Sequence, residues 1–467
     1  MKRASTTTDA LDGRSAALQA VIDALRGRQF VTETLRTLRT SGRLDRREAK
    51  LAMEIGQGTI RHLLTIEHLL TVLASLVAQR TKPVVRAVLC TAAYQIVWMD
   101  RIPPFAAVDR AVELGRRLAG GRIPALVNAV LRRLTDAIAL RRTPWERLNP
   151  CQVRVDWTLA CQFDRPVLPA PDDLIAHLAV ATGERVERYA ELTDRCGPQN
   201  AEAVAWAWRA TPPTVLQVNT LRATPQQVAV KLRAAVGDAC EWIGETVFVP
   251  AGISLFDTPP FADGLLYVQD TTGHAAALAV EARPGERVLD LCAAPGGKSV
   301  TLALRMQDRG LVLACDTVPQ RLARVSENAA RLGLKCISPQ LLSPPGHLPT
   351  EHDLFDAAIV DVPCSNSGVI ARRPEARLGL TPAKLAALVT VQRELLRRAA
   401  RHVRPGGRLV YSTCSVEPDE NERVVADFLA CHSDWRLDTQ QTIWPAWGPR
   451  LGDWRDGGYF ARLRRSE

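Results

Sequence analysis

The sequence of 467 residues lacks long apolar runs. No uninterrupted apolar stretch approaches the roughly 20 residues that a membrane-spanning helix needs, and the richest run, residues 69–78, is interrupted by Thr71 and Ser75. The start, MKRASTTTDALDGR, is followed by no apolar core and therefore does not resemble a secretory signal. These absences argue against membrane insertion and export, and they predict a cytoplasmic protein.

The cysteine spacings of metal and redox sites are also missing. Eleven cysteines are scattered from Cys90 to Cys431, and no two of them form a CxxC pair, which argues against a zinc knuckle or a thioredoxin-type site. An odd number of cysteines in a chain without an export signal indicates free thiols. Most are expected to be small buried hydrophobic residues, so a functional cysteine has to be identified by its neighbours.

Lysine is scarce. Only seven of the 60 basic residues are lysines, and arginine therefore dominates the net charge of +10. The base composition of the genome is the simplest reason for the arginine excess, but its position is more informative. Residues 1–145 contain 24 basic and 12 acidic residues, a net charge of +12, and the remaining 322 residues carry −2. This uneven distribution predicts a surface for a polyanion, with a solvated basic surface as the alternative.

The length suggests two or three domains. Apolar residues recur at helical spacing through residues 14–140, which predicts an all-α domain of six or seven helices. Residues 141–172 contain five prolines and no clear periodicity, so we expect a linker there. Residues 173–265 mix helical segments with short β-rich runs, as in a small α+β module.

Strands and helices alternate from Glu286 onward. Strands are predicted at 287–291, 311–316, 357–362 and 407–413, and helices at 298–306, 319–333, 382–403 and 421–430. This alternation with short connections predicts a doubly wound, mostly parallel sheet. In such sheets ligands bind at the carboxyl ends of the strands.

The first motif with chemical content, VLDLCAAPGGK, spans residues 288–298. An apolar strand enters a glycine loop that opens a helix, where free N–H groups and the absence of side chains let a ligand approach the backbone. The motif is neither a Walker loop nor a dinucleotide GxGxxG. Together with Asp316 at the end of the next strand, it fits a nucleoside ligand whose ribose hydroxyls donate to a carboxylate. A generic turn and a solvated lysine at Lys298 are the alternatives.

Two cysteines follow two other predicted strands. The strand AAIVDV contains Asp361 as its second-last residue and is followed by Cys364, and the strand GRLVYS is followed by Cys414. A lone cysteine is more often part of the core than a catalyst. Two cysteines just past strands of one parallel sheet, with a carboxylate three residues before one of them, are instead expected to face a shared cleft.

These motifs carry a resemblance to a known family. CAAPGGK, DVPCS and STCS resemble the motifs of RNA 5-methylcytosine methyltransferases that use S-adenosylmethionine, and VNTLR, VQDTTG and the ending DGGYFARLRR are similar as well. The helical part, through SGRLDRREAKLAMEIGQGTIRH and VNAVLRRL, is similar to the NusB-like amino-terminal domain of a small-subunit ribosomal RNA methyltransferase. The resemblance covers nearly the whole chain and is weakest over residues 141–210.

The resemblance implies a multidomain fold and a function. Residues 1–145 would be an all-α, NusB-like, RNA-binding domain, residues 146–265 a linker and a small α+β module, and residues 266–467 an α/β, Rossmann-like class I methyltransferase domain. The cofactor would be S-adenosyl-L-methionine and the partner small-subunit ribosomal RNA, bound by a monomer. Transfer RNA as the substrate, or a non-catalytic RNA-binding or ribosome assembly factor, are the alternatives.

The resemblance also implies roles for residues. Cys414 would be the nucleophile that adds to carbon 6 of cytosine and makes carbon 5 reactive towards a methyl donor. Cys364 would assist release of the methylated product, and Asp361 would contact the cofactor or the base. The cofactor would be held by Cys292, Ala293, Ala294, Pro295, Gly296, Gly297, Lys298, Asp316 and Asp361.

One position departs from the family pattern. The family usually carries an aspartate after the third strand, near the cofactor adenine, and ungapped counting puts Leu342 there. That contact would then be lost or taken over by Ser343 or a backbone carbonyl, since the next carboxylate is Glu351. Farther along, Arg372 and Arg373 either contact RNA phosphate or lie in a surface loop.

Overall fold

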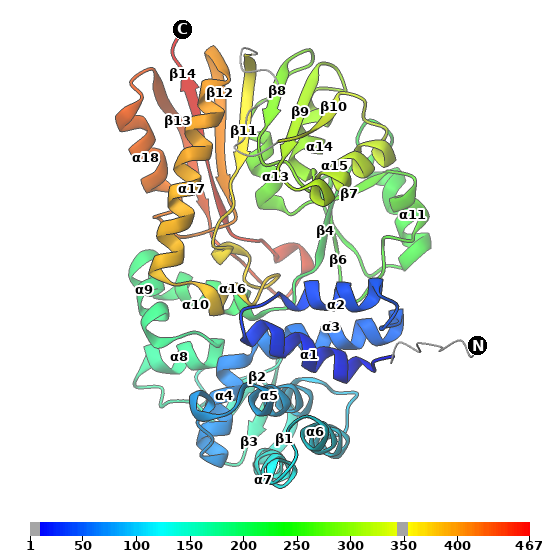
Figure 1. Ribbon diagram of the computed structural model, residues 1–467, viewed down its shortest axis with the longest axis vertical. Coiled ribbons are helices and arrows are strands. Elements are labelled where there is room, and N and C mark those ends of the chain that lie inside the picture. Colours follow the sequence, from blue (N-terminus) through cyan, green and yellow to red (C-terminus); the bar gives the residue numbers. More distant parts are fainter. Residues whose placement is uncertain (1–9, 343–353) are drawn as a thin grey trace, which may run out of the picture. The chain divides into compact units, whose positions relative to one another are not determined.

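The computed structural model describes residues 10–342 and 354–467 (Figure 1). The chain divides into two compact units. The first consists of Met1–Ala210 with Arg373–Gly379, and the second of Thr211–Arg372 with Leu380–Glu467. Within the described residues, no helix combines the length and the apolar character that crossing a membrane requires.

The first unit begins with seven α-helices, as predicted for residues 14–140. They are α1 (Gly13–Leu25), α2 (Val31–Thr40), α3 (Arg46–Arg61), α4 (Leu63–Ala74), α5 (Pro83–Trp98), α6 (Pro104–Ala119) and α7 (Ile123–Asp136), with a short 3-10 helix at Ala78–Arg80. Asp45 caps α3 by accepting from the N–H groups of Arg47 and Glu48. The Glu48 carboxylate accepts from the N–H of Gly13, at the start of α1, and thereby ties the two helices together.

A small sheet occupies much of the segment that we predicted to be a linker. Strands β1 (Ile138–Pro144), β2 (Gln152–Arg154) and β3 (Leu159–Phe163) pair antiparallel in the order β1-β3-β2. The linker prediction is wrong here because strands of three to seven residues are too short to show a period of two. A cation–π contact also stabilises the segment, since the guanidinium carbon of Arg154 lies 3.8 Å from the ring centroid of Trp145.

The first unit is completed by α8 (Leu174–Thr182), α9 (Val186–Cys196), α10 (Pro198–Arg209) and α16 (Ala376–Gly379). The last of these lies in a segment that follows the Cys364 motif in sequence. Arg377 of this segment forms a buried ion pair with Glu184 at 2.6 Å and donates to the carbonyl of Gly183. Glu375 accepts from the N–H of Val31, at the start of α2. Seven residues of the carboxy-terminal half of the chain therefore fold as part of the helical unit.

The second unit contains a four-stranded antiparallel sheet in the order β5-β6-β4-β7. Its strands are β4 (Thr214–Val218), β5 (Glu241–Ile243), β6 (Thr246–Val249) and β7 (Leu266–Val268), accompanied by α11 (Pro225–Val236) and α12 (Pro259–Ala262). Strands β4 and β6 coincide with the β-rich runs predicted in the small α+β module. A capping box between Thr224 and Gln227 begins α11.

The larger sheet of the second unit has seven strands in the order β10-β9-β8-β11-β12-β14-β13. They are β8 (Arg287–Asp290), β9 (Leu311–Asp316), β10 (Ile337–Leu341), β11 (Phe355–Asp361), β12 (Val403–Thr413), β13 (Trp435–Ile443) and β14 (Gly458–Arg465). The five strands from β10 to β12 are parallel, β14 runs antiparallel to β12, and β13 pairs antiparallel with β14. The predicted multidomain fold with a mostly parallel, Rossmann-like sheet is confirmed. The strand order reverses between β8 and β11, where such sheets bind ligands.

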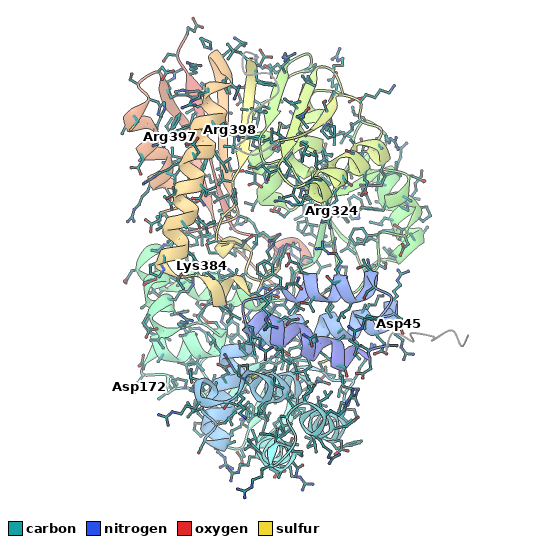
Figure 2. All side chains as sticks on the ribbon, viewed as in Figure 1. Asp45, Asp172, Arg324, Lys384, Arg397 and Arg398 are labelled. Atoms are coloured by element: carbon teal, nitrogen blue, oxygen red, sulfur yellow. The ribbon has the colours of Figure 1, made fainter. Side chains whose placement is uncertain are left out.

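Helices cover both faces of this sheet (Figure 1). They are α13 (Thr271–Leu278), α14 (Gly297–Arg305), α15 (Pro319–Leu332), α17 (Pro382–Arg401) and α18 (Glu422–Cys431), with 3-10 turns at Ser367–Val369 and Leu451–Asp453. Successive side chains of β8 point to opposite faces of the sheet. Val288 packs in one core cluster with residues of α14 and α15, and Leu289 packs in the other with residues of α17 and α18. Exposed basic side chains on two of these helices include Arg324 on α15 and Lys384 and Arg397 on α17 (Figure 2).

Candidate functional site

The three predicted motifs meet at the carboxyl ends of neighbouring parallel strands in the second unit. Strand β11 lies between β8 and β12, and Asp361 is paired with Ser412 in the register of β11 and β12. The loops after β8, β11 and β12 therefore leave the sheet at the same edge. The structure thus brings the glycine loop and both cysteine motifs to one place.

The glycine loop after β8 approaches the end of β9. The N–H of Ala293 donates to the carbonyl of Cys315 over 2.8 Å, and the N–H of Ala294 donates to Asp316 Oδ2 over 3.3 Å. Gly296 has a φ of +103°, where a Cβ would come within 3.3 Å of Val325, so glycine is required for this turn. Helix α14 begins at the next residue without a cap from any described side chain, which leaves amino-terminal N–H groups available to a ligand.

Lys298 joins the glycine loop to the cysteine motifs. Its Nζ lies 2.7 Å from Asp361 Oδ2, and Asp361 Oδ1 accepts from the hydroxyl of Ser412 over 2.9 Å. Burial works to lower the pKa of Lys298, but the charge and hydrogen bond of Asp361 outweigh it and raise that pKa above its usual range. Lys298 is therefore an ion-paired residue inside the site and not a solvated lysine.

Asp290, at the end of β8, is a fully buried carboxyl group. Its Oδ2 accepts from the Ser299 hydroxyl over 2.6 Å, and burial raises its pKa to about 7 despite this hydrogen bond and the charge of Lys298. An ordinary aspartate would be ionised at neutral pH. Here the neutral and charged forms are close in free energy near pH 7.

The raised pKa of Asp290 predicts a pH-dependent stability. The unfolded chain releases this proton near its ordinary pKa of 3.8 and the folded protein near 7, so the contribution falls as pH rises between those values, by at most about 4 kcal/mol. Urea unfolding at pH 5 and pH 8 is expected to show Asp290→Asn gaining stability relative to the parent protein as pH increases. The exposed Asp238→Asn serves as control, and a constant difference for Asp290→Asn would contradict the prediction.

The two predicted cysteines are in direct contact. Cys364 Sγ and Cys414 Sγ are 2.9 Å apart, and all eleven cysteines are free thiols. Cys364 is buried, and the hydrogen bond with Cys414, together with burial, raises the pKa of Cys364 well above its usual range. Cys364 is thus held as a thiol whose S–H can donate to a neighbouring sulfur atom.

Cys292 lies in the glycine loop, but its chemistry differs from that of the pair. Burial, together with the nearby carboxylates of Asp290, Asp361 and Asp316, raises its pKa above the usual range. A protonated, buried thiol is a poor nucleophile. Its place in the loop fits a packing and binding role.

Asn366 and Glu420 were missed by sequence reasoning. Asn366 Oδ1 accepts from Cys414 Sγ at 3.3 Å, and Asn366 adopts a left-handed φ of +62°. Glu420 is completely buried and binds both cysteine loops. Glu420 lies in the acidic run EPDENE before a helix, where carboxylates usually act as solvated caps, so no signal in the single sequence separated it from its neighbours.

Other predicted positions have more ordinary surroundings. Leu342 is buried in the core and donates its N–H to the carbonyl of Asp316 over 3.0 Å, while Ser343 and Glu351 lie outside the described residues. Arg372 pairs with Asp456 at 2.5 Å and donates to the carbonyl of Pro213. Its side chain thus already has protein partners.

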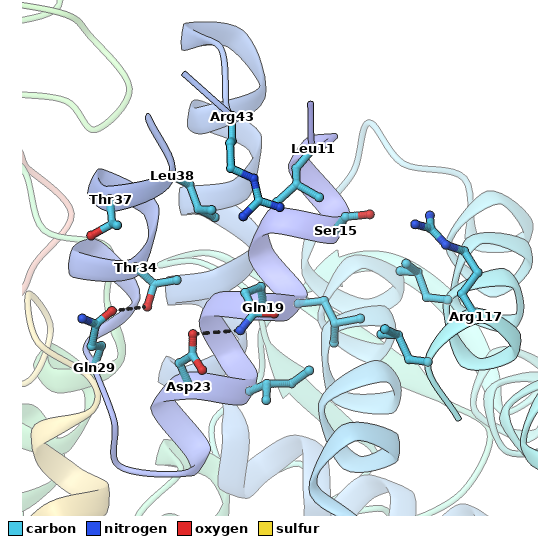
Figure 3. A pocket seen from close by; sticks show the side chains of 14 residues that line it. Leu11, Ser15, Gln19, Asp23, Gln29, Thr34, Thr37, Leu38, Arg43 and Arg117 are labelled. Carbon is cyan, nitrogen blue, oxygen red and sulfur yellow. Dashed lines mark hydrogen bonds between the residues drawn. The ribbon is translucent and has the colours of Figure 1, made fainter. Parts of the chain in front are cut away.

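A separate cavity of about 480 Å³ lies in the first unit (Figure 3). Side chains of α1, α2 and α6 line it, with Leu18, Ile22 and Leu114 among the apolar ones and Arg43 and Arg117 among the basic ones. None of the predicted catalytic or cofactor-binding residues lines this cavity. The candidate site is therefore defined by the motifs of the second unit.

Comparison with known families assigns both parts of the chain. Residues 277–446 match the family described as 16S rRNA methyltransferase RsmB/F, and residues 12–136 match the NusB family. The first match contains the glycine loop and both cysteine motifs. The second covers the helices at the start of the first unit.

Individual proteins are similar over almost the whole chain. A Bacillus subtilis (strain 168) protein named probable ribosomal RNA small subunit methyltransferase B is 30% identical over 431 residues, covering 91% of this chain and 90% of that protein. The ribosomal RNA small subunit methyltransferase B of Klebsiella pneumoniae (strain 342) is 28% identical, covering 96% and 97%. The crystal structure of PH0851 has a TM-score of 0.71 at 21% identity and covers 98% of this chain and 99% of its own, which is a similarity of fold.

Proposed function

The chain belongs to the ribosomal RNA small subunit methyltransferase B family, and on this premise we propose that it methylates carbon 5 of a cytosine in 16S ribosomal RNA through a covalent cysteine adduct. Membership makes it an S-adenosylmethionine-dependent ribosomal RNA methyltransferase. The observation that carries the finer proposal is the contact of Cys364 and Cys414 at 2.9 Å beside the glycine loop. Methyl transfer to an already nucleophilic nitrogen or oxygen needs no thiol pair, whereas carbon 5 of cytosine needs activation by a nucleophile.

The residues of the glycine loop fit S-adenosylmethionine. Available N–H groups at the start of α14, the close backbone approach at Gly296 and the carboxylate of Asp316 provide donors and an acceptor for a nucleoside with an amino-acid tail. We assign Cys292–Lys298, Asp316 and Asp361 to this binding site. When bound, the cofactor supplies an electrophilic methyl group.

Cys414 is the nucleophile in this proposal. Its sulfur adds as a thiolate to carbon 6 of cytosine, which forms the S–C6 bond, breaks the C5–C6 double bond and makes carbon 5 nucleophilic. Bound S-adenosylmethionine would supply the methyl group for carbon 5. Hydrogen bonding or protonation at ring nitrogen 3 favours this addition. Asp361, held by Lys298 and Ser412, is positioned to contact the base or the cofactor.

Cys364 acts in the second half of the reaction. A base removes the proton from carbon 5, the C5–C6 double bond re-forms, and the S–C6 bond breaks with its electron pair on Cys414. A thiol at 2.9 Å from that sulfur stabilises the departing thiolate by hydrogen bonding. This role agrees with the raised pKa of Cys364.

The RNA side of the proposal rests on charge. The target base must be unpaired or turned out of a helix to reach the thiol, and the net charge of +12 over residues 1–145 supports binding of RNA phosphates there. We propose residues 1–145 as the RNA-binding domain, 146–265 as the intermediate module and 266–467 as the catalytic domain of a cytoplasmic monomer.

The test is to map the methylated nucleotide. Unmethylated 16S ribosomal RNA and transfer RNA are incubated separately with the protein and S-adenosylmethionine carrying a labelled methyl group, and the products are digested and analysed by mass spectrometry. We expect 5-methylcytosine at a defined position of 16S ribosomal RNA. Methylation of transfer RNA alone would move the substrate, label at another atom would remove the cysteine mechanism, and no label in either RNA would favour the assembly factor.

A further inference from the structure

Glu420 is the most completely enclosed carboxylate around the cysteine pair. It lies between β12 and α18 with 0% of its surface exposed. Its Oε1 accepts from the N–H of Ser365 over 2.8 Å and from the amide of Gln392 over 2.9 Å. Its Oε2 accepts from the hydroxyls of Ser365 and Ser415, both at 2.5 Å. One side chain thus receives four hydrogen bonds.

The groups bound by Glu420 belong to both cysteine loops. Ser365 directly follows Cys364, and Ser415 directly follows Cys414. The backbone ladder between β11 and β12 stops short of these residues, with its last described bond from the N–H of Val362 to the carbonyl of Ser412. Beyond that point, the described links between the two loops are one backbone bond, from the N–H of Gly368 to the carbonyl of Cys414, and contacts that involve side chains.

Other hydrogen bonds between the loops involve Ser367 and Asn366: Ser367 Oγ accepts from the N–H of Val416 over 2.9 Å, and Asn366 Oδ1 accepts from Cys414 Sγ. Ser415 Oγ lies 3.1 Å from Ser365 Oγ and 3.0 Å from Ser367 Oγ. The N–H of Gly368 donates to the carbonyl of Cys414 over 3.0 Å. The Glu420 carboxylate accepts hydrogen bonds from both loops. It also accepts from the amide of Gln392 on α17, and that amide donates to the carbonyl of Pro363 as well.

The surroundings of Glu420 are unusual for a buried acidic residue. Within the described part of the chain, it forms no ion pair, and its hydrogen-bond donors are the neutral groups of Ser365, Ser415 and Gln392. Burying a carboxyl group without a cation is unfavourable unless its acceptors are satisfied. The hydrogen bonds from Ser365, Ser415 and Gln392 therefore explain why this carboxyl group is buried.

We propose that Glu420 is a positioning residue that sets the separation of Cys364 and Cys414 by clamping Ser365 and Ser415. This inference rests on the proposed function, in which Cys364 and Cys414 must lie close together for the adduct to form and to be released. Misplacement of reacting groups by about 1 Å lowers rates by roughly a hundredfold. In this proposal the length of the Glu420 side chain positions the two loops. Two conservative substitutions test its length and its charge separately.

Glu420→Gln keeps the length of the side chain and removes its charge. The amide oxygen can occupy the Oε1 position and accept from Ser365 N–H and Gln392, while the amide nitrogen donates to the hydroxyls of Ser365 and Ser415, which can accept. Glu420→Asp keeps the acid but is shorter by one methylene, so the four bonds cannot all be made. Glu422→Asp is the matched control, because Glu422, the first residue of α18, accepts from the Thr442 hydroxyl of β13 and makes no described hydrogen bond with either cysteine loop.

The experiment measures closure of the thiol pair in the full-length protein without RNA. The oxidant diamide takes up two electrons and two protons from Cys364 and Cys414, which become a disulfide, and the cross-linked peptide is quantified by mass spectrometry after alkylation of the remaining thiols. Closure requires the two sulfur atoms to meet and does not require methyl transfer. Its outcome is therefore separate from that of the RNA mapping.

We expect Glu420→Asp to close at least about tenfold more slowly than the parent protein. Glu420→Gln should close at the parental rate or faster, and Glu422→Asp at the parental rate. The pKa of Cys364 is raised by the hydrogen bond with Cys414, by burial and by the charges of Cys414 and Glu420. Loss of the Glu420 charge therefore favours the thiolate and faster disulfide formation. It cannot mimic the slower closure expected when the two loops are no longer held together. In methylation assays the Asp variant should lose kcat at an unchanged KM for S-adenosylmethionine. Parental closure by Glu420→Asp, or slow closure by Glu420→Gln alone, would overturn the proposal.

Discussion

Cys414→Ala is expected to lower methyl transfer by at least about four orders of magnitude, the scale on which removal of a nucleophile lowers turnover in other covalent enzymes. Without this sulfur no group adds to carbon 6, and carbon 5 stays too weak a nucleophile to take the methyl group. Cys364 cannot replace it, because burial and the nearby charge of Glu420 remain in this variant and still raise the pKa of Cys364. Single-turnover assays with labelled S-adenosylmethionine and 16S ribosomal RNA measure the loss.

A matched control separates this effect from general damage. Cys431 is an exposed thiol at the end of α18, outside the site, and Cys431→Ala should keep parental turnover. Isothermal titration should also show that Cys414→Ala binds S-adenosylmethionine as the parent does, because Cys414 is not among the residues assigned to the cofactor. Retention of more than a small percentage of turnover would remove Cys414 from the role of nucleophile.

The catalytic part of the fold could be predicted from local patterns. The glycine loop, the alternating strands and helices and the ends of β11 and β12 each lie within short stretches of sequence whose period and turn residues decide the structure. Because parallel strands present their carboxyl ends at one edge, the sequence also predicted that the loops of Cys364 and Cys414 would share a site. Their contact at 2.9 Å follows from that topology.

Other features depend on contacts between distant residues and could not be predicted. The buried pair of Arg377 and Glu184 joins positions far apart in sequence, and nothing in the ARRPEAR run indicates that it folds with the helical unit. The strands β1–β3 are too short for a periodic signal. Glu420 differs from the acidic residues around it only through its partners, which a single sequence does not reveal.

Cys364→Ala is expected to convert the enzyme into one that traps its product. Addition of Cys414 and methyl transfer do not require the second thiol, so the adduct should still form. Its release requires Cys414 to depart as a thiolate, and the alanine removes the S–H group that lies 2.9 Å from that sulfur. The methylated RNA should therefore remain attached to the protein.

The trapped species is measured as a protein–RNA band that survives denaturing electrophoresis, appears only with S-adenosylmethionine and disappears on nuclease treatment. We expect it to rise from undetectable in the parent protein to a large fraction of the variant, while a Cys364→Ala, Cys414→Ala double variant forms none. If Cys364→Ala forms no adduct and Cys414→Ala does, the two roles are reversed. Adduct formation by neither variant would mean that the thiol pair at the ends of β11 and β12 does not act by covalent addition, since a bond to either sulfur has to persist when the step that breaks it is removed.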